Sequence, residues 1–492
     1  MLFNSFIFVL LFLPITIVIY FLINRAGRYT AAKVFLLAMS LWFYCYSEPW
    51  NVIVLIASIL VNYAIAVFGF IRVKKPAGRK ALLILGISLN LLSLFYFKYI
   101  GFFFRTLNHL FQTTFTFESL ILPLGISFFT FGQIAFLVDS YRDPETRYGF
   151  LDYALFTAFF PKISVGPIAF AKEMIPDFSD DLKKQADFEN IAKGLVLFSF
   201  GLAKKAILAD SLAACVDWGY NNLPSADSAI AILMVVGYSL QIYFDFSGYC
   251  DMAMGICQML NLSLPLNFDS PYRALSINDF WKRWHITLTR FFRQYVYFPL
   301  GGSRKGKVRT YLNIMIIFLL SGLWHGANYT FVFWGFLHGV GICLSKAFGK
   351  YTQKLPKVIR AIFMFFYVNL TWVFFRSATI EQAFYVIKKL FAFHFTPISD
   401  KAVYVAAASP AEFGLLEWLL SLSDPDLPVY VGLVLLYVLL IIGILCATLM
   451  KTPVERIRQF QPTKKLLAAT VLLLVWSIIS LSDISTFIYT NF

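Results

Sequence analysis

Two histidines in the middle of the chain could carry out acid–base chemistry. The sequence contains five histidines, and His285 and His325 lie in the short motifs WHIT and LWHGAN. His325 ends an apolar run, where an ionisable side chain is costly unless a partner or water satisfies it. Because an imidazole titrates near neutral pH and stays neutral when buried, it can accept a proton there. We therefore predict that His325 is a general base, whereas His338 is interpreted as structural.

His285 lies 40 positions before His325, so the two can meet only through the fold. Such a pair would suit proton transfer from an oxygen nucleophile, with one imidazole accepting the proton and the other orienting a reactant. The alternative for each histidine is a hydrogen-bonded core residue. Gly326 permits close backbone approach, and Asn328 offers a polar contact one turn away. These neighbours favour a site, and Trp324 and Asn328 are candidate pocket residues.

A second polar group interrupts apolar sequence in YFDFSGYCD, residues 243–251. Asp245, Ser247 and Asp251 could form the polar wall of a substrate cavity or a proton-linked site. The alternative is that the two carboxylates cap the start of a helix and hold nearby arginines, since Asp is favourable at a helix N-terminus. Ser247 and Gly248 are turn residues, which agrees with this alternative.

Residues 271–310 form a strongly basic stretch with nine Lys and Arg side chains and a single carboxylate, Asp279. Aromatic residues interleave with the charges, which is typical of amphipathic helices at a membrane interface. The glycine-rich loop at 301–307 lacks the P-loop pattern. It is interpreted as a cytoplasmic hairpin, or as a site whose basic side chains recognise the phosphates of a donor such as a CoA thioester. On the second interpretation, Asp279, Arg283 and Arg290 are candidate binding residues.

The composition indicates the kind of structure that must position these residues. Of 492 residues, 59% are hydrophobic and 14% are charged, whereas soluble domains carry about 25% charged residues. The mean hydropathy is +0.71. These values predict an all-α polytopic membrane protein. The net charge of +15 comes from loops between apolar spans, so we attribute it to positive-inside topology and anionic lipid headgroups and expect no nucleic-acid partner.

Apolar segments of about 20 residues, the length that crosses a bilayer, recur along the whole chain. They predict roughly eleven transmembrane helices together with re-entrant or interfacial helices. The expected spans are 2–23, 34–47 (short), 50–71, 81–99, 119–138, 191–209, 228–246, 311–327, 330–347, 361–375, 428–449 and 466–483. Pro and Gly interrupt residues 123–170, which predicts broken backbone buried in the protein interior. Basic loops belong in the cytoplasm, and this rule places both termini outside.

The six cysteines form no CxxC pair. They are interpreted as small buried hydrophobic residues, and the sequence shows no spacing typical of a metal site. The first apolar segment lacks a basic leader and a cleavage site, so it is interpreted as a transmembrane helix and not as a removed signal peptide.

Several motifs together resemble those of the membrane-bound O-acyltransferase superfamily. They are FWKRWHITLTRFFRQYVYFPLGG at 280–302 and SGLWHGANYTFVFWGFLHG at 321–339, with YFDFSGYCDMAMG at 243–255 and LPLGISFFTFGQIAFLVDSYR at 122–142. They are most similar to the bacterial branch, which contains the alginate O-acetylation membrane protein and, more distantly, the teichoic acid D-alanyl transfer protein. The resemblance implies one integral-membrane domain over 1–492, with a core at about 120–380 and peripheral helices at 1–110 and 428–483.

This resemblance also implies an activity and a location. The family's LWHG histidine corresponds to His325, and the upstream WH position, which is Asn in many eukaryotic members, corresponds to His285. The implied enzyme resides in the bacterial plasma membrane, binds no cofactor, and takes an acyl group from acetyl-CoA or another cytoplasmic thioester. The implied partners are an exported acetyltransferase and a polysaccharide.

We therefore expect an O-acetyltransferase acting on an exported polysaccharide such as alginate. One alternative is D-alanyl transfer to teichoic acid from a carrier-protein thioester. Another is a polysaccharide or lipid transporter without chemistry. The transporter alternative is weakened by the lack of an internal sequence repeat, which is common in transporters.

Overall fold

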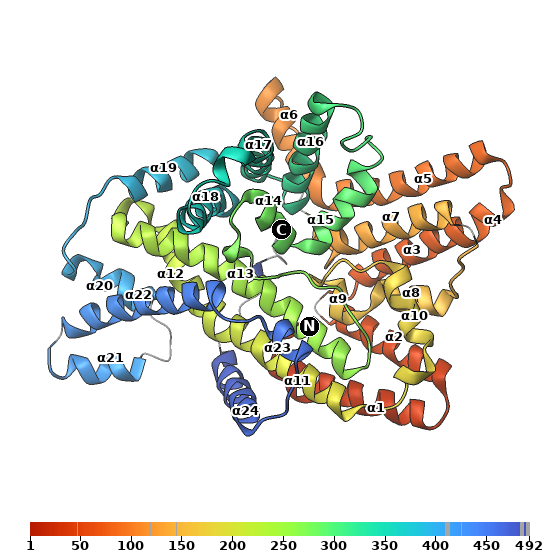
Figure 1. Cartoon of the computed structure of the whole chain (residues 1–492), viewed down its shortest axis with the longest axis horizontal. Coiled ribbons are helices and arrows are strands. Elements are labelled where there is room, and N and C mark those ends of the chain that lie inside the picture. The colour runs from red at the N-terminus through yellow and green to blue at the C-terminus, as the bar shows by residue number, and fades with distance from the viewer. Residues whose placement is uncertain are drawn as a thin grey trace.

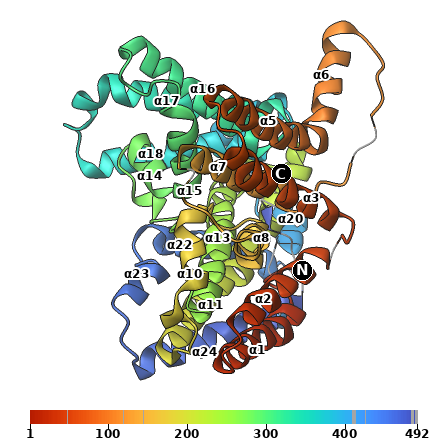
Figure 2. The ribbon, with the colours of Figure 1, turned by 90° about the vertical axis from the view of Figure 1, so that its right-hand side faces the viewer.

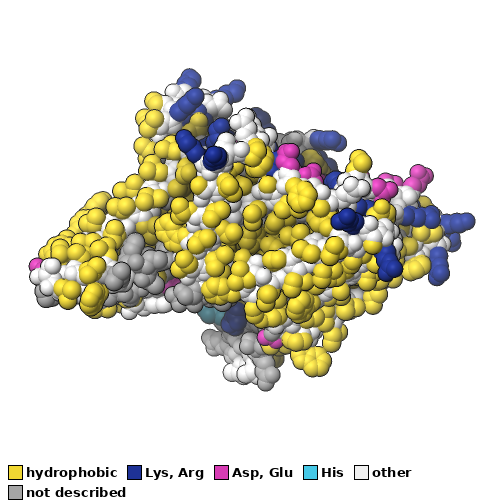
Figure 3. Space-filling view, turned by 90° about the horizontal axis from the view of Figure 1, so that it is seen from below, with side chains coloured by type: hydrophobic (Ala, Val, Ile, Leu, Met, Phe, Trp, Pro, Cys, Tyr) yellow, Lys and Arg dark blue, Asp and Glu magenta, His cyan; other side chains and the backbone are white. Residues whose placement is uncertain are grey.

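The structure is a computed structural model that describes residues 1–492 except 47, 118–119, 144, 409–413, 425, 483–486 and 489–492. The described residues form helices joined by turns and loops (Figure 1), which confirms the predicted all-α class. Figure 3 shows a broad face covered by hydrophobic side chains, with Lys and Arg gathered toward its margins. This surface is the one expected of a protein surrounded by lipid.

Within the described residues, eight helices are long and apolar enough to cross a membrane. They are Phe8–Arg25, which includes α1 (Leu13–Arg25); Asn51–Arg72, which includes α3 (Asn51–Tyr63); Pro76–Phe111, which includes α5 (Pro76–Leu94) and α6 (Ile100–Phe111); α13 (Ser228–Met259); α16 (Lys307–His325); α17 (Tyr329–Thr352); α18 (Lys357–Arg376); and α22 (Leu427–Thr448). Four other expected spans form shorter helices: α2 (Tyr29–Cys45), α7 (Ile126–Arg142), α11 (Phe188–Ala203) and α24 (Lys464–Ile479). Figure 2 shows α6 standing away from the other helices.

The other described α-helices are shorter still and connect or cover the long ones. They are α4 (Phe70–Arg72), α8 (Phe150–Ala158), α9 (Phe160–Ile163), α10 (Ala171–Ser179), α12 (Asp210–Asn221), α14 (Ile277–Arg283), α15 (Ile286–Phe292), α19 (Ile380–Phe391), α20 (Ala402–Ala408), α21 (Gly414–Ser421) and α23 (Pro453–Arg458). The chain from 153 to 171 is buried throughout. The broken backbone at 159–171 therefore lies inside the protein, as predicted, whereas much of the described chain at 142–150, within the same predicted region, is exposed.

The long helix α13 runs through the middle of the molecule, with α11 beside it (Figure 1). These two helices touch at pairs of glycines. A Cβ added to Gly194 would lie 2.5 Å from the carbonyl oxygen of Gly255, and one added to Gly201 would lie 2.7 Å from that of Gly248. Small residues allow helices in a membrane to approach this closely, so the glycines fix α13 against α11.

The continuous α13 corrects one expectation about Asp245 and Asp251. These carboxylates do not cap the start of a helix, because α13 begins at Ser228 and runs through both of them to Met259. They hold lysines and not arginines: Lys205 Nζ lies 2.7 Å from Asp245, and Lys204 Nζ lies 2.6 Å from Asp251. The lysines come from a π-helical turn, η5 (Lys204–Ala209), that continues α11. The turn signal of Gly248 was misread, because this glycine serves helix packing.

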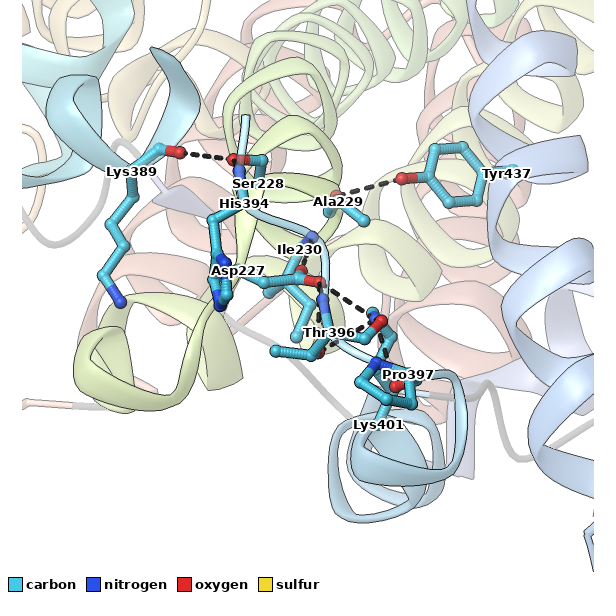
Figure 4. Close-up of polar contacts among 10 residues, drawn as sticks. All are labelled: Asp227, Ser228, Ala229, Ile230, Lys389, His394, Thr396, Pro397, Lys401 and Tyr437. Carbon is cyan, nitrogen blue, oxygen red and sulfur yellow. Dashed lines mark hydrogen bonds and ion pairs between the residues drawn. The ribbon is translucent and has the colours of Figure 1, made fainter. Parts of the chain in front are cut away.

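A polar cluster at the start of α13 anchors the segment that follows α19 (Figure 4). The carboxylate of Asp227 accepts hydrogen bonds from the backbone N–H groups of Ile230 and Thr396, both at 3.0 Å, and pairs with Lys401 at 2.9 Å. Lys401 also donates to the carbonyl oxygen of Thr396 at 2.7 Å. Both charged side chains are almost fully buried, and their mutual pairing offsets the cost of that burial.

Candidate active site

The fold brings His285 and His325 together inside the protein. Their ring centroids are 6.4 Å apart, and the residues are 0% and 2% exposed. His325 is the last residue of α16, and His285 is the N-cap of α15. The indole of Trp324 contacts both rings, with centroid distances of 5.9 Å to His285 and 4.9 Å to His325. Two residues 40 positions apart thus share one buried aromatic site.

Close packing of α16 on α17 fixes the position of His325. A Cβ on Gly322 would lie 2.2 Å from the carbonyl oxygen of Phe331, so only glycine fits at this crossing. The His325 ring then packs among aromatic rings, with centroids 5.1 Å from Trp334 and 5.2 Å from Phe375. Because these bulky neighbours restrict its rotamers, the imidazole is held in a defined orientation.

Asn267 orients the other imidazole. Its side-chain oxygen accepts from the backbone N–H of Thr287 at 3.2 Å, which identifies this atom as the oxygen because a backbone N–H can only donate. The same oxygen lies 3.1 Å from Nδ1 of His285. Nδ1 must therefore carry the proton, and Nε2 must be the lone-pair nitrogen.

The Nε2 atom of His285 is buried and has no hydrogen-bond partner among the residues that the structure describes. Burial also lowers the pKa of His285 to about 3, so the ring is neutral at physiological pH. A buried acceptor without a partner is costly unless a bound molecule satisfies it. His285 thus presents a buried lone-pair nitrogen that no described residue satisfies.

Lys98 belongs to this site but was not singled out from the sequence. Its ammonium donates to the carbonyl oxygens of Trp324 and His325, at 2.7 and 3.3 Å, and to the hydroxyl of Ser127 at 3.1 Å. The cation therefore caps the C-terminal end of α16, where the helix dipole favours positive charge. The sequence did contain a signal for Lys98, because it is an ionisable residue inside an apolar segment, just as His325 is.

Among the described contacts, none joins Asp245 or Ser247 to the histidines by a polar group. Asp245 pairs with Lys205, and Ser247 accepts a long hydrogen bond from Lys204 at 3.4 Å. The residue between them, Phe246, is the one that meets the site, with its ring centroid 4.9 Å from that of His285. Helix α13 thus contributes an aromatic wall to the site, whereas its carboxylates hold η5.

The remaining candidates form contacts within the protein. Arg283 donates to Asp279 at 2.9 Å and to the backbone oxygen of Asp269 at 3.1 Å. Arg290 binds both carboxylate oxygens of Glu173, at 2.6 and 2.8 Å. Asn328 caps α17, and its amide donates to the carbonyl oxygen of Ala378 at 2.8 Å. These contacts position α14, α15 and α17, and the predicted binding roles of the four residues stay predictions.

Among the described residues, no three His, Cys, Asp or Glu side chains gather as the ligands of a metal would. The groups that the site itself offers are two buried imidazoles in an aromatic enclosure, with a lysine beside the backbone of one of them. Such a site is suited to taking a proton from a nucleophile as that nucleophile attacks.

Comparison with known proteins identifies the family of the chain. The sequence pattern of the MBOAT, membrane-bound O-acyltransferase family, matches residues 79–387, which include both histidine motifs. The chain therefore belongs to the membrane-bound O-acyltransferase family. It is a multi-pass membrane enzyme, as its helices and its family indicate.

Three relatives illustrate the similarity to known proteins. A peptidoglycan O-acetyltransferase of Helicobacter pylori is 41% identical over 422 residues, which cover 79% of each chain. A probable alginate O-acetylase of Pseudomonas aeruginosa is 35% identical over 412 residues, or 81% of this chain and 76% of the relative. A teichoic acid D-alanyltransferase of Bacillus subtilis is 28% identical over 254 residues, or 48% of this chain and 62% of the relative.

Proposed function

We propose that this protein is an O-acetyltransferase that passes an acetyl group from a cytoplasmic thioester toward an exported polysaccharide. The observation that carries the proposal is the buried pair of His285 and His325, 6.4 Å apart in a chain of this family. Two relatives that match about four-fifths of the chain are described as O-acetylating enzymes of polysaccharides. The D-alanyltransferase matches only about half of it, and this difference favours acetyl as the group transferred.

In the proposed reaction, an acceptor hydroxyl attacks the carbonyl carbon of the thioester. His325 takes the hydroxyl proton as the new C–O bond forms, and Nε2 of His285 accepts a hydrogen bond that orients a reactant. The tetrahedral intermediate then breaks its C–S bond, and the proton held by the imidazole passes to the departing sulfur. Each step uses a neutral imidazole at the start and restores it at the end, so the histidines act catalytically.

The proposed topology places the donor in the cytoplasm and the acceptor outside. It rests on the basic stretch 271–310, which the positive-inside rule assigns to the cytoplasm. The acceptor is proposed to be an envelope or secreted polysaccharide, reached directly or through an exported partner acetyltransferase. The relatives' names favour peptidoglycan or alginate as the polymer.

The test is acetyl transfer from radiolabelled acetyl-CoA in membranes that hold equal amounts of wild type, His325→Ala or His109→Ala. We expect label in an exported partner or polymer with the wild type. We expect a loss of about 100-fold or more with His325→Ala, the scale of general-base catalysis. His109→Ala is the matched control, because His109 lies exposed on α6, and it should retain the wild-type rate.

Full transfer by His325→Ala would show that the general-base assignment is wrong. Labelling from a D-alanyl carrier protein but not from acetyl-CoA would show that the transferred group is D-alanyl. Chemical analysis of the modified polymer, as an acetyl ester of peptidoglycan or of alginate, identifies the acceptor.

A further inference from the structure

A cavity of about 520 Å³ lies between the central helices and the C-terminal helices, away from the histidine site. One wall is the end of α11 with η5 and α13, and the other is formed by α22, α23 and α24. Most of the lining is apolar. It comprises Phe200, Ala203, Lys204, Ile207, Leu208, Ser211, Tyr243, Phe244, Leu435, Val438, Leu439, Ile442, Cys446, Met450, Lys451, Thr452, Pro453, Arg456, Leu473 and Trp476. A cavity of this kind at the edge of a membrane protein is accessible to lipid and not only to water.

The cavity is elongated along α22. On α22 its lining runs from Leu435 to Cys446, and it continues to Met450 beyond the end of the helix. The 11 positions from Leu435 to Cys446, at the helical rise of 1.5 Å, correspond to about 16 Å. One leaflet contributes half of a hydrocarbon core of about 30 Å, or about 15 Å. The cavity is therefore long enough to hold a lipid acyl chain together with the start of its headgroup.

The two ends of the cavity differ in charge. The end near Leu435 is apolar, whereas Lys451 and Arg456 line the other end and are exposed. Neither of these two side chains forms an ion pair among the described residues. The nearby Glu455 accepts from the backbone N–H of Thr452 at 2.8 Å, in the capping box of α23. The basic end thus offers two cations to an anion at headgroup level.

A third cation strengthens this end. The guanidinium of Arg273 donates to the carbonyl oxygens of Thr448 and Met450, both at 2.6 Å, and so caps the C-terminus of α22. Lys204, by contrast, is neutralised by Asp251 inside the cavity. Positive charge is therefore concentrated at one end, which is the arrangement that attracts anionic lipid headgroups.

We propose that this cavity is a binding site for an anionic phospholipid. Its phosphate faces Lys451 and Arg456, and one acyl chain lies along α22 toward Leu435. The bound chain fills the space between α22 and α24 and so joins these helices to α11 and α13. The proposal does not depend on the transferase chemistry, because none of its residues touches the histidine site in a described contact.

The test uses a cysteine that lines the cavity as a reporter. Cys446 on α22 and Cys343 on α17 are both half-buried and free, and only Cys446 lines the cavity. The purified full-length protein in detergent is treated with N-ethylmaleimide in the presence of phosphatidylglycerol, phosphatidylcholine or inorganic phosphate. Alkylation of each cysteine is then followed by mass spectrometry of peptides.

We expect phosphatidylglycerol to slow alkylation of Cys446 by 5-fold or more, on the order of the occupancy that two charge contacts give, and to leave Cys343 unchanged. Phosphatidylcholine should protect less, and inorganic phosphate should not protect. The double variant Lys451→Gln/Arg456→Gln should lose the preference for phosphatidylglycerol. The matched control Lys464→Gln/Lys465→Gln removes two neighbouring cations that do not line the cavity, and it should keep the preference.

Equal protection by both lipids, or equal protection of both cysteines, would overturn the proposal. Protection by inorganic phosphate alone would identify an anion site without an acyl chain, and would overturn it as well. Because the wild-type protein provides the first result by itself, the test does not depend on whether the variants fold.

Discussion

The ammonium of Lys98 holds the end of the helix that carries His325. It donates to three uncharged oxygen atoms. Two of them are the carbonyl oxygens of Trp324 and His325, and the third is the hydroxyl of Ser127. Hydrogen bonds from a charged donor contribute about 1.5–3 kcal/mol each. The cation therefore fixes the backbone of the proposed base, and Lys98 is a positioning residue.

We predict that Lys98→Met lowers the rate of acyl transfer by about 10–100-fold, since a displacement near 1 Å at a catalytic group costs about that much. Lys98→Arg retains a cation and should recover part of the rate. The measurement is single-turnover transfer with protein amounts matched. The control is Lys80→Met, which removes an exposed lysine of α5, and a Lys98→Met variant as fast as this control would contradict the assignment.

The burial of His285 makes the stability of the folded protein depend on pH. Its pKa falls from the usual 6.5 to about 3 in the folded protein because burial disfavours the charged ring. Between these two pH values the unfolded chain binds a proton that the folded chain does not. The stability gained from a neutral His285 is therefore complete above about pH 6.5 and is lost as the pH falls toward 3.

We predict that His285→Asn makes unfolding less sensitive to acid, because asparagine takes up no proton. The measurement is the unfolding temperature in detergent at pH 7 and at pH 4.5. The decrease on acidification should be smaller for His285→Asn than for the wild type. Equal decreases in the two proteins would show that His285 does not titrate on unfolding.

At the scale of elements, the buried carboxylates in the middle of α13 are paired with lysines of η5. Asp245 and Lys205 are each 2% exposed and lie 2.7 Å apart, and Asp245 also accepts from the backbone N–H of Ile488 at 2.9 Å. A buried carboxylate in such a pair stabilises the contact between two elements. This role differs from the substrate-cavity role that was one of the two alternatives from the sequence.

We predict that Asp245→Asn destabilises the protein by about 1–3 kcal/mol, because Lys205 then keeps, among the described residues, only Asp210, at 2.8 Å, as its charged partner in a buried site. The double variant Lys205→Met/Asp245→Leu should recover much of the stability, since a matched apolar pair often substitutes for a buried ion pair. The measurement is thermal unfolding in detergent alongside acyl transfer. Unchanged unfolding with a strong loss of transfer would instead support a place for Asp245 in the substrate cavity.

The same elements show what the sequence could and could not predict. Apolar length identified the long helices, because crossing a bilayer imposes a minimum length on each one. The expected span 228–246 ended too early, because α13 continues to Met259. Gly248 is a turn residue by local preference, but in the structure it packs against Gly201. A glycine's role depends on what approaches it, and that information lies in a distant part of the chain.

At the scale of the whole molecule, the all-α membrane class was predictable, and His285 and His325 were both singled out as candidates. The class follows from composition. The cost of placing an imidazole in apolar sequence singled out His325, whereas its meeting with His285 was a hypothesis that depended on the fold. The contributions of Lys98 and Asn267 were not predicted. Their contacts with the site join positions 226 and 18 residues apart, and they arise only when separate elements pack together. Asp269 and Glu173, the protein partners of Arg283 and Arg290, were not predicted either.

The left-handed backbone of His285, with φ of 43°, has a consequence for how this position can change over generations. Few residues with a side chain adopt this conformation readily, and Asn, Asp and His are the most enriched among them. Asn is the residue that many eukaryotic members of the superfamily carry at the corresponding position. The geometry of one peptide unit therefore restricts the replacements open to natural selection, and asparagine satisfies it without rebuilding the junction between α14 and α15.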